Sequence, residues 1–359
     1  MDCDLHTIEP DDLWERYLEE PFKAFASRFS ASSWRRKPRA SGRPAVHPHY
    51  TRAVERAWNT ETHLEAMDIE GVDVAILYGT RGRHVQMRDD LDPPLAAALA
   101  RAHNNWTYDY CRANPERLKF AAQISFHDVT LAVAEARRAV RDLGAVAIVG
   151  NPNPVNGRHI HDMYFEPLWD AVEELGVPMG FHPTGVWSLK DNIGRRFLDH
   201  PNGSLIATAA HNPVETMLGF ASLAVGGVLE RHPTLRCVFL EATCGWLPWW
   251  LWRLDETWEK FGYEANVHLS IRPSEYFVRQ CFIGTEPDEK MLPQVVDAIG
   301  DRNIVFATDY PHRDGLFPEA LNAFFAMEGL SDATRGKILW DNCARLYSMA
   351  VGDLSGASR

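Results

Sequence analysis

The first ten residues, Met1-Asp2-Cys3-Asp4-Leu5-His6-Thr7-Ile8-Glu9-Pro10, begin the fold and supply half of a candidate site. They predict a very short strand. Because side chains alternate along a strand, Asp4 and His6 are expected on the same face. A carboxylate beside an imidazole forms half of a divalent metal site. Asp2 shares this face but lies deeper in the strand, so Asp4 is the better candidate ligand.

Two further candidate ligands lie far along the chain. His182 ends the apolar segment Gly180-Phe181-His182, and Asp309 follows the apolar residues before Thr308. An Asp-x-His pair alone is common by chance, and it gains weight only when such ligands arrive from distant strands. A satisfied core histidine and a helix N-cap are the structural alternatives for His182 and Asp309.

Composition narrows the class of protein. The chain has 359 residues, of which 45% are hydrophobic, enough for one large barrel or two ordinary domains. Its formal net charge of −12 argues against nucleic acid and anionic membranes as main partners. Six scattered cysteines without a Cys-x-x-Cys motif favour a reducing compartment, and we expect neither a leader nor a membrane-spanning segment. We expect a cytoplasmic homo-oligomer, a dimer, acting on a small molecule.

The region from Lys23 to Arg52 is strongly basic, with six arginines, two lysines and no Asp or Glu. Pro38, Pro44 and Pro48 disfavour a regular helix through its middle. In an acidic protein this segment predicts a lid or an anion-attracting loop over a site. A solvated surface loop or a subunit contact is the alternative.

From residue 59 onward, apolar segments alternate with helical patterns. Continuously apolar strands separated by helices indicate parallel pairing with both faces buried. With the first motif, the chain predicts eight strands and therefore a (β/α)₈ barrel with an inserted lid-like loop region. A doubly wound sheet is the alternative, but no Gly-x-Gly-x-x-Gly follows an early strand. We expect one domain over residues 1–349 and a flexible tail over 350–359. The predicted strands after the first are 72–79, 118–125, 145–150, 177–182, 235–241, 280–286 and 303–309.

Polar residues fall at the carboxyl ends of these strands, where barrel enzymes place their working residues. Asp4 and His6 end the first strand and His182 the fifth, while Glu241, Glu286 and Asp309 end the last three in turn. Two imidazoles and two carboxylates, from Asp4, His6, His182 and Asp309, predict a site for Zn²⁺. The share of oxygen ligands makes Mn²⁺ the competing ion.

The chain resembles the amidohydrolase superfamily, in the branch that includes aminocarboxymuconate semialdehyde decarboxylase and the resorcylate decarboxylases. The resemblance covers most of the chain and implies a (β/α)₈ barrel with one divalent metal held by Asp4, His6, His182 and Asp309. It is carried by Asp4-Leu5-His6-Thr7-Ile8-Glu9-Pro10, Gly176-Val177-Pro178-Met179-Gly180-Phe181-His182-Pro183, Phe239-Leu240-Glu241 with Gly245-Trp246-Leu247-Pro248, Thr308-Asp309-Tyr310-Pro311-His312 and Asp341-Asn342-Cys343-Ala344.

Two positions depart from this family's pattern. Asp4 stands where many relatives have His or Glu, and compared with His-x-His it adds negative charge, which favours a harder metal. Decarboxylases of the branch often carry a His at the end of the sixth strand, whereas this chain reads Glu241-Ala242-Thr243-Cys244. Glu241 either replaces that His or orients a ligand from behind.

Further candidates surround this set. His312 follows Asp309 closely and is a candidate general acid or base, with a capped structural residue as the alternative. Tyr78, Arg81, His211 and Trp246 are candidate substrate-binding residues, although packing or a solvated loop would also account for each. Cys244 is a weaker candidate nucleophile, since no paired His is visible.

These residues predict metal-dependent decarboxylation of an aromatic or unsaturated carboxylic acid. Asp309 would deliver or shuttle the proton to the carbon that loses CO₂, with His312 or Glu241 assisting. The alternative is metal-dependent hydrolysis of an amide, lactone or related bond, in which Asp309 would deprotonate a metal-bound water. A metal-binding protein without turnover is the third class.

Overall fold

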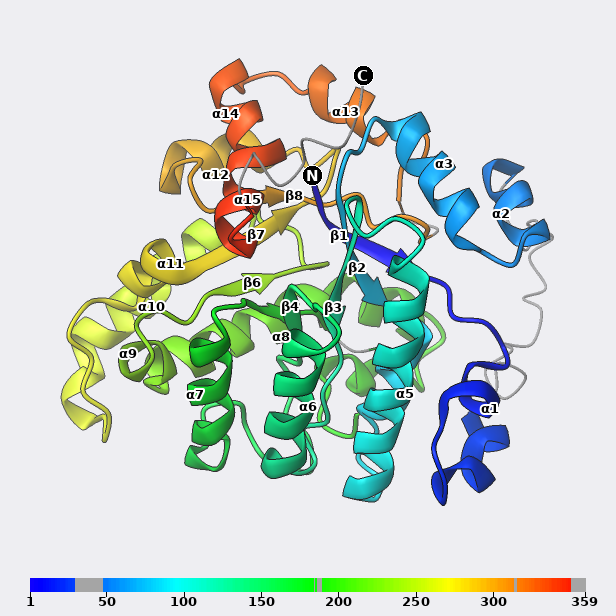
Figure 1. Ribbon diagram of the computed structural model, residues 1–359. Coiled ribbons are helices and arrows are strands. Elements are labelled where there is room, and N and C mark those ends of the chain that lie inside the picture. The colour runs from blue at the N-terminus through cyan, green and yellow to red at the C-terminus, as the bar shows by residue number, and fades with distance from the viewer. Residues whose placement is uncertain (30–47, 184, 186–188, 313–314, 350–359) are drawn as a thin grey trace.

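The computed structural model describes residues 1–29, 48–183, 185, 189–312 and 315–349. All eight predicted strands are confirmed, and they pair in parallel in sequence order from the first to the eighth. The (β/α)₈ barrel is therefore confirmed (Figure 1). The strands are β1 (Asp2–Thr7), β2 (Ala75–Gly79), β3 (Leu118–Ala122), β4 (Ala147–Gly150), β5 (Met179–Phe181), β6 (Cys237–Phe239), β7 (Cys281–Thr285) and β8 (Ile304–Phe306).

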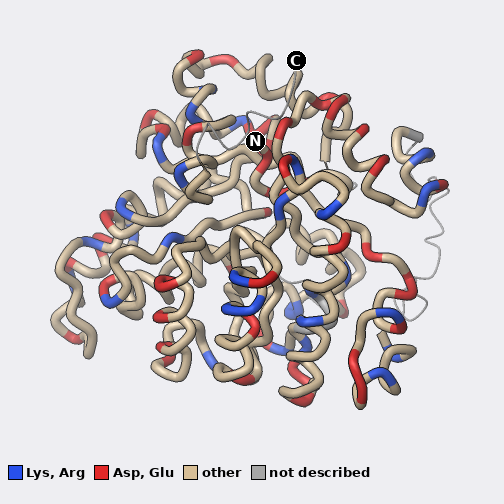
Figure 2. Tube along the Cα trace, in the orientation of Figure 1, with Lys and Arg blue, Asp and Glu red and all other residues tan. Residues whose placement is uncertain are grey.

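Helices separate the strands and cover the outside of the barrel, as seen for α5, α6 and α7, which lie side by side in Figure 1. Acidic and basic side chains are interspersed along these outer elements (Figure 2). The helices are α1 (Leu13–Tyr17), α2 (Thr51–Glu55), α3 (Thr60–Glu70), α4 (Arg81–Gln86), α5 (Pro93–Cys111), α6 (Val129–Arg141), α7 (Glu166–Leu175), α8 (Gly203–Val225), α9 (Val228–Arg231), α10 (Leu247–Phe261), α11 (Pro273–Gln280), α12 (Leu292–Ile299), α13 (Ala320–Ala326), α14 (Asp332–Gly336) and α15 (Asn342–Tyr347).

Local sequence sets several helix ends. The Asn59 side chain accepts a hydrogen bond from the Thr62 amide at the start of α3. Gly71 ends the same helix with φ of 76°, a left-handed conformation that glycine adopts without a Cβ clash. The sequence does not predict the short helix α4, which follows β2 directly and contributes to the candidate site.

A bulge in β1 directs the site residues. Asp2 pairs with Ala75 and Leu5 with Leu77, so three steps along β1 match two along β2. The extra residue changes which side chains face inward, as bulges beside active sites commonly do. Cys3 packs in the inner cluster of the barrel, and His6, three residues later, still reaches the interior beside Asp4.

The barrel interior is filled below the site. Tyr78 is fully buried, and its hydroxyl lies 3.5 Å from that of Tyr347 on α15. Gly180 on β5 leaves room for the Tyr78 ring, because a Cβ there would lie 2.2 Å from the Tyr78 hydroxyl. This floor closes the barrel beneath the strand ends.

Only the two ends of the basic segment are described. Tyr50 packs against Phe317 with ring centroids 5.8 Å apart, and its hydroxyl donates to the His312 carbonyl at 3.3 Å. Residues 30–47, and the tail 350–359, lie outside the described residues, so the lid and the flexible tail stay predictions. No helix in the described part of the chain is both long and apolar enough to cross a membrane.

We expect Gly180→Ala to lower the free energy of unfolding by about 1–3 kcal/mol, because the new methyl group overlaps Tyr78. Urea denaturation measures this change. Adding Tyr78→Phe removes the nearest atom and should restore part of the loss. Gly336→Ala is the control, since a methyl group added there would have no neighbour within 4 Å. Equal stability of Gly180→Ala and the wild type would contradict this packing.

Candidate metal centre and adjoining cavity

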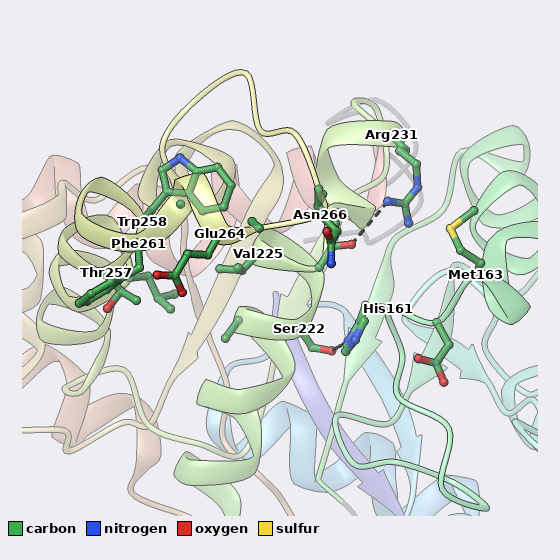
Figure 3. A pocket seen from close by; sticks show the side chains of 17 residues that line it. His161, Met163, Ser222, Val225, Arg231, Thr257, Trp258, Phe261, Glu264 and Asn266 are labelled. Atoms are coloured by element: carbon green, nitrogen blue, oxygen red, sulfur yellow. Dashed lines mark hydrogen bonds between the residues drawn. The ribbon is translucent and has the colours of Figure 1, made fainter.

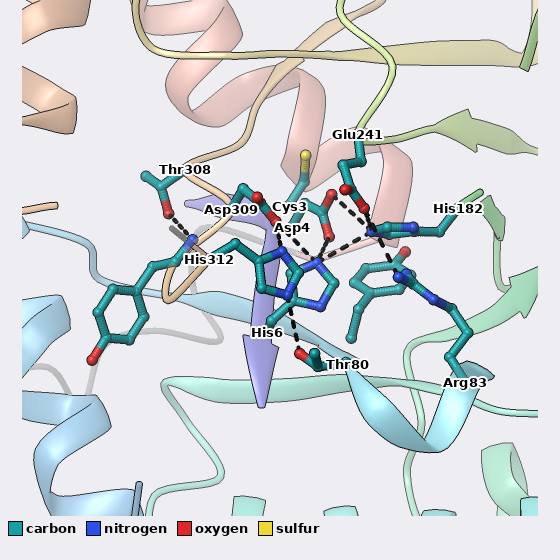
Figure 4. A network of polar contacts seen from close by, with 12 residues as sticks. Cys3, Asp4, His6, Thr80, Arg83, His182, Glu241, Thr308, Asp309 and His312 are labelled. Carbon is teal, nitrogen blue, oxygen red and sulfur yellow. Dashed lines mark hydrogen bonds and ion pairs between the residues drawn. The ribbon is translucent and has the colours of Figure 1, made fainter. Parts of the chain in front are cut away.

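The four predicted ligands converge at the carboxyl ends of the strands (Figure 4). Asp4 and His6 lie within β1, whereas His182 and Asp309 follow β5 and β8 directly. The Nε2 atom of His6 lies 3.3 Å from Asp4 Oδ1, 3.2 Å from Asp309 Oδ1 and 3.2 Å from His182 Nε2. Ligand atoms of Asp4, His6 and His182 lie within 4.8 Å of one another, and so do those of His6, Glu241, Asp309 and His312. His6 is common to both groups, and each has the residue types and spacing that could hold a divalent cation.

Burial makes this group depend on a compensating charge. Asp4, His6 and His182 are almost completely buried, and neither carboxylate oxygen of Asp4 has a hydrogen-bond partner among the described residues. Burial alone lowers the pKa of His6, but the Asp4 and Asp309 carboxylates outweigh it and raise this pKa to about 10. The residues therefore suit a cation, because buried carboxylates without partners are costly.

His312 is paired with Asp309. Its Nδ1 lies 2.6 Å from Asp309 Oδ1, its Nε2 lies 3.2 Å from the Thr80 hydroxyl, and its ring stacks on His6 at 4.0 Å. Burial raises the pKa of Asp309, but the adjacent His312 and His6 outweigh it and hold this pKa well below its usual range. Asp309 is thus ionised and contacts an imidazole that can carry a proton.

Glu241 enters the same group from the end of β6. It has φ of 48°, a left-handed conformation uncommon for a residue with a side chain, and Asp309 shares it with φ of 57°. Glu241 Oε2 lies 2.9 Å from His182 Nε2. The loop after it is held by Glu289, whose Oε1 accepts from the Cys244 and Gly245 amides, both at 2.7 Å.

Arg83 on α4 is a site residue that sequence reasoning missed. It is 2% exposed, its Nη2 lies 3.9 Å from Glu241 Oε2, and its Nε and Nη1 have no hydrogen-bond partner among the described residues. Burial lowers the pKa of its guanidinium. A buried guanidinium with free donors is a ready site for a carboxylate.

Two predicted substrate-binding residues lie at the end of β2, and their role toward a substrate stays a prediction. Arg81 is directed to Asp11, with Nη1 at 3.0 Å from its carboxylate, and its side chain is 44% exposed. Tyr78 has no exposed surface and forms part of the floor beneath the imidazoles, with its ring 6.4 Å from that of His6. Thr80 and Arg83 also reach the site from this strand end, through contacts with His312 and Glu241.

The remaining candidates lie either beside the site or in the loop that supports it. His211 on α8 is partly buried, and burial lowers its pKa while nearby Glu241 opposes that change. The Trp246 indole donates to the Ala242 carbonyl at 2.9 Å and so fixes the loop after Glu241, while its role toward a substrate stays a prediction. Cys244 is buried, and burial raises the pKa of its thiol, which disfavours a nucleophilic thiolate.

A cavity of about 290 Å³ adjoins the centre. Its walls come from the start of α8, the loops after β6 and β7, and the turn after β8. Glu241 and Asp309 open onto it, together with Thr208, Asn212, Thr243, Glu286 and Leu316. This volume accommodates a small organic acid next to the candidate ligands.

A second, larger groove of about 860 Å³ lies outside the barrel between α8 and α10 (Figure 3). Several of its polar side chains have partners within the protein: His161 Nδ1 lies 2.5 Å from the Ser222 hydroxyl, and Arg231 pairs with Glu166 at 3.0 Å. None of the candidate ligands lines this groove. The smaller cavity is therefore the candidate substrate site.

Glu9 positions the element that carries Arg83. Its carboxylate accepts from the Arg81 and Gly82 amides at 2.8 and 3.0 Å and lies 3.0 Å from His103 Nε2 on α5. These contacts fix the start of α4 against β1 and α5. Gly82 permits this approach, because a Cβ there would lie 2.2 Å from the His103 ring.

Comparison with known proteins agrees with this architecture. The sequence profile described as amidohydrolase matches residues 1–349. The 2-amino-3-carboxymuconate-6-semialdehyde decarboxylase of Dictyostelium discoideum is 25% identical over 81% of this chain and 77% of that protein. The gamma-resorcylate decarboxylase of Rhodococcus jostii is 27% identical over 80% of this chain and 87% of that protein. A dihydroxybenzoic acid decarboxylase structure from Polaromonas, with bound manganese and 2-nitroresorcinol, superposes with a TM-score of 0.73 at 19% identity over 98% of both chains.

Glu9→Gln should weaken the fold in a pH-dependent way. Burial raises the pKa of Glu9, but His103 and the two amides outweigh it and bring this pKa from 4.5 to about 2. The ionised carboxylate therefore stabilises the native state above pH 4.5, by at most on the order of 3 kcal/mol, and this stabilisation is lost as pH falls toward 2. The difference in unfolding free energy between wild type and Glu9→Gln, from urea denaturation at several pH values, should shrink below pH 4.5. A difference that does not change with pH would refute the role of this carboxylate.

Proposed function

Because the chain belongs to the amidohydrolase family, we propose that it is a metal-dependent decarboxylase acting on an aromatic or unsaturated carboxylic acid. The observation that carries this proposal is the convergence of Asp4, His6, His182 and Asp309 beside the buried guanidinium of Arg83. Two relatives of the chain are named as decarboxylases of acids of this kind. The oxygen-rich ligand set favours Mn²⁺ over Zn²⁺, and manganese is the ion in the Polaromonas structure.

When bound, the divalent ion supplies a Lewis acid that polarises a substrate oxygen and stabilises negative charge as the carbon–carbon bond breaks. Asp4, His6, His182 and Asp309 would hold it. The burial of Asp4, His6 and His182 excludes bulk water from their side of the site and strengthens the charge interactions there.

Arg83 orients the substrate. The Nε and Nη1 donors of its guanidinium lack partners among the described residues, and a carboxylate can accept from both in one plane. Because Arg83 is only 2% exposed, this pairing forms in a largely desolvated place where it is strong. The link between Arg83 and the cavity is Glu241, which borders the cavity and lies 3.9 Å from Arg83 Nη2.

Asp309 and His312 handle the proton. Loss of CO₂ leaves the bonding electron pair on the substrate carbon, and that carbon must gain one proton. The 2.6 Å contact between His312 Nδ1 and Asp309 Oδ1 allows a proton on the imidazole to reach the carboxylate. Asp309, which borders the cavity, then passes this proton to the carbon.

One incubation separates this function from hydrolysis. Purified protein loaded with Mn²⁺ or Zn²⁺ is given a panel of hydroxylated aromatic acids, unsaturated acids, amides and lactones in ¹⁸O-labelled water. Released CO₂ with a proton gained at carbon supports the proposal. Uptake of ¹⁸O into the products without CO₂ would overturn it in favour of hydrolysis. The dimer and the cytoplasmic location stay predictions.

Arg83→Met should lower kcat/KM about 100-fold, mainly through a higher KM, because the substrate carboxylate loses its charged partner. Arg81→Met is the matched control, since Arg81 lies two residues away and pairs with Asp11 at the surface. It should behave within about twofold of wild type. Metal content is measured in both variants. If Arg81→Met were the impaired variant, the assignment of Arg83 would be wrong.

His312→Gln should lower kcat about 100-fold with little change in KM or metal content, since the proton supply to Asp309 is lost. The pH profile of kcat should lose one of its limbs. Thr80→Val is the control for the other side of the imidazole, because it removes only the 3.2 Å contact at Nε2. A variant that keeps the wild-type pH profile would exclude His312 from proton transfer.

A further inference from the structure

A lone pair of His182 Nε2 and a lone pair of Glu241 Oε2 face each other. His182 Nδ1 lies 3.2 Å from the Pro183 carbonyl, which only accepts hydrogen bonds, so the ring proton belongs on Nδ1. The lone pair of Nε2 then points at the other ligands. Glu241 Oε2 lies 2.9 Å from this same Nε2, and a carboxylate oxygen also has only lone pairs to offer.

A hydrogen bond does not explain this contact in the metal-loaded protein. A nitrogen that coordinates a metal carries no proton, so His182 cannot donate to Glu241 from Nε2. Two acceptor atoms at 2.9 Å repel one another unless a cation lies beside both. Neighbouring donor atoms in an octahedral site with bonds of about 2.1 Å are about 3.0 Å apart, which matches this contact.

We infer that Glu241 is a fifth protein ligand of the metal, added to Asp4, His6, His182 and Asp309. This inference rests on the metal site of the proposed function and extends it. Ligand atoms of Glu241, Asp309 and His6 all lie within 4.8 Å of one another, so one ion can reach them together. The left-handed backbone of Glu241 and the hold of Glu289 on the following loop keep its carboxylate at this position.

Charge supports the fifth ligand. Two imidazoles with the carboxylates of Asp4 and Asp309 neutralise a divalent ion, and Glu241 adds one negative charge. Arg83, with Nη2 at 3.9 Å from Glu241 Oε2, supplies the compensating positive charge from a buried position. Three carboxylates make the ligand set a harder Lewis base. The site should therefore prefer Mn²⁺ to Zn²⁺ more strongly than a site formed by the other four ligands alone.

The test counts water molecules on the metal. Wild type, Glu241→Gln and Glu241→Ala are loaded with Mn²⁺, and water proton relaxation with Mn²⁺ electron paramagnetic resonance gives the affinity and the number of bound waters. We expect Glu241→Ala to gain at least one bound water and both variants to bind Mn²⁺ about 10- to 100-fold more weakly. Their preference for Mn²⁺ over Zn²⁺ should also fall.

Glu286→Gln is the matched control, because Glu286 borders the same cavity from the exposed rim. It should bind Mn²⁺ as wild type does. If Glu241→Ala keeps the wild-type number of bound waters, Glu241 is not a ligand, even where its affinity falls. Melting curves without metal show whether each variant is folded, and Glu241→Gln keeps the side-chain volume should alanine disrupt the loop. A wild type that binds no divalent metal would overturn the proposed function itself.

Discussion

The structure depends on the seam where the first strand meets the end of the last. The Asp309 amide donates to the Asp4 carbonyl at 3.1 Å, and the His6 amide donates to the Tyr310 carbonyl at 2.7 Å. The buried Asp2 carboxylate accepts from the Thr308 amide at 3.2 Å, and burial raises its pKa to about 7. Three metal-ligand candidates therefore lie on the seam itself. Closing the barrel and assembling the site are one event, although the residues are about 300 positions apart.

This seam concentrates negative charge in a buried place. Asp4 and Asp309 face His6 there, and the raised pKa of His6 reflects how strongly these carboxylates attract a positive charge. A proton on one imidazole satisfies that attraction only in part, because both Asp4 oxygens still lack hydrogen bonds within the described chain. A divalent ion would balance the negative charge of both carboxylates at once. The buried carboxylates at the seam are therefore the groups that we propose to hold the metal.

Sequence alone predicted the eight strands and the convergence of the ligands, because apolar segments and polar strand ends follow from burial. His182, Glu241 and Asp309 lie one to three residues beyond their strands, where a barrel places its site. Sequence alone did not predict side-chain directions that depend on the local path of the backbone. Arg81 and Arg83 would share a face on an extended chain, but α4 begins at Arg81 and turns them about 200° apart. The depth of Tyr78 in the barrel and the loop hydrogen bond of Trp246 are likewise not visible in residue type.

Glu241 stands at the end of β6, where decarboxylases of the resembled branch often carry a His. This difference changes which residues we expect to bind the metal and which to transfer a proton. A histidine there could hold and release a proton near neutral pH. The Glu241 carboxylate instead lies 2.9 Å from His182 Nε2, where we propose that it binds the cation. Under this proposal, proton transfer is left to an imidazole beside the ligands. That imidazole is His312, which stacks on His6 and contacts both Asp309 and Thr80. The extra carboxylate and the Asp309–His312 pair are therefore two parts of one proposed arrangement, in which Glu241 would bind the metal and His312 would supply the proton.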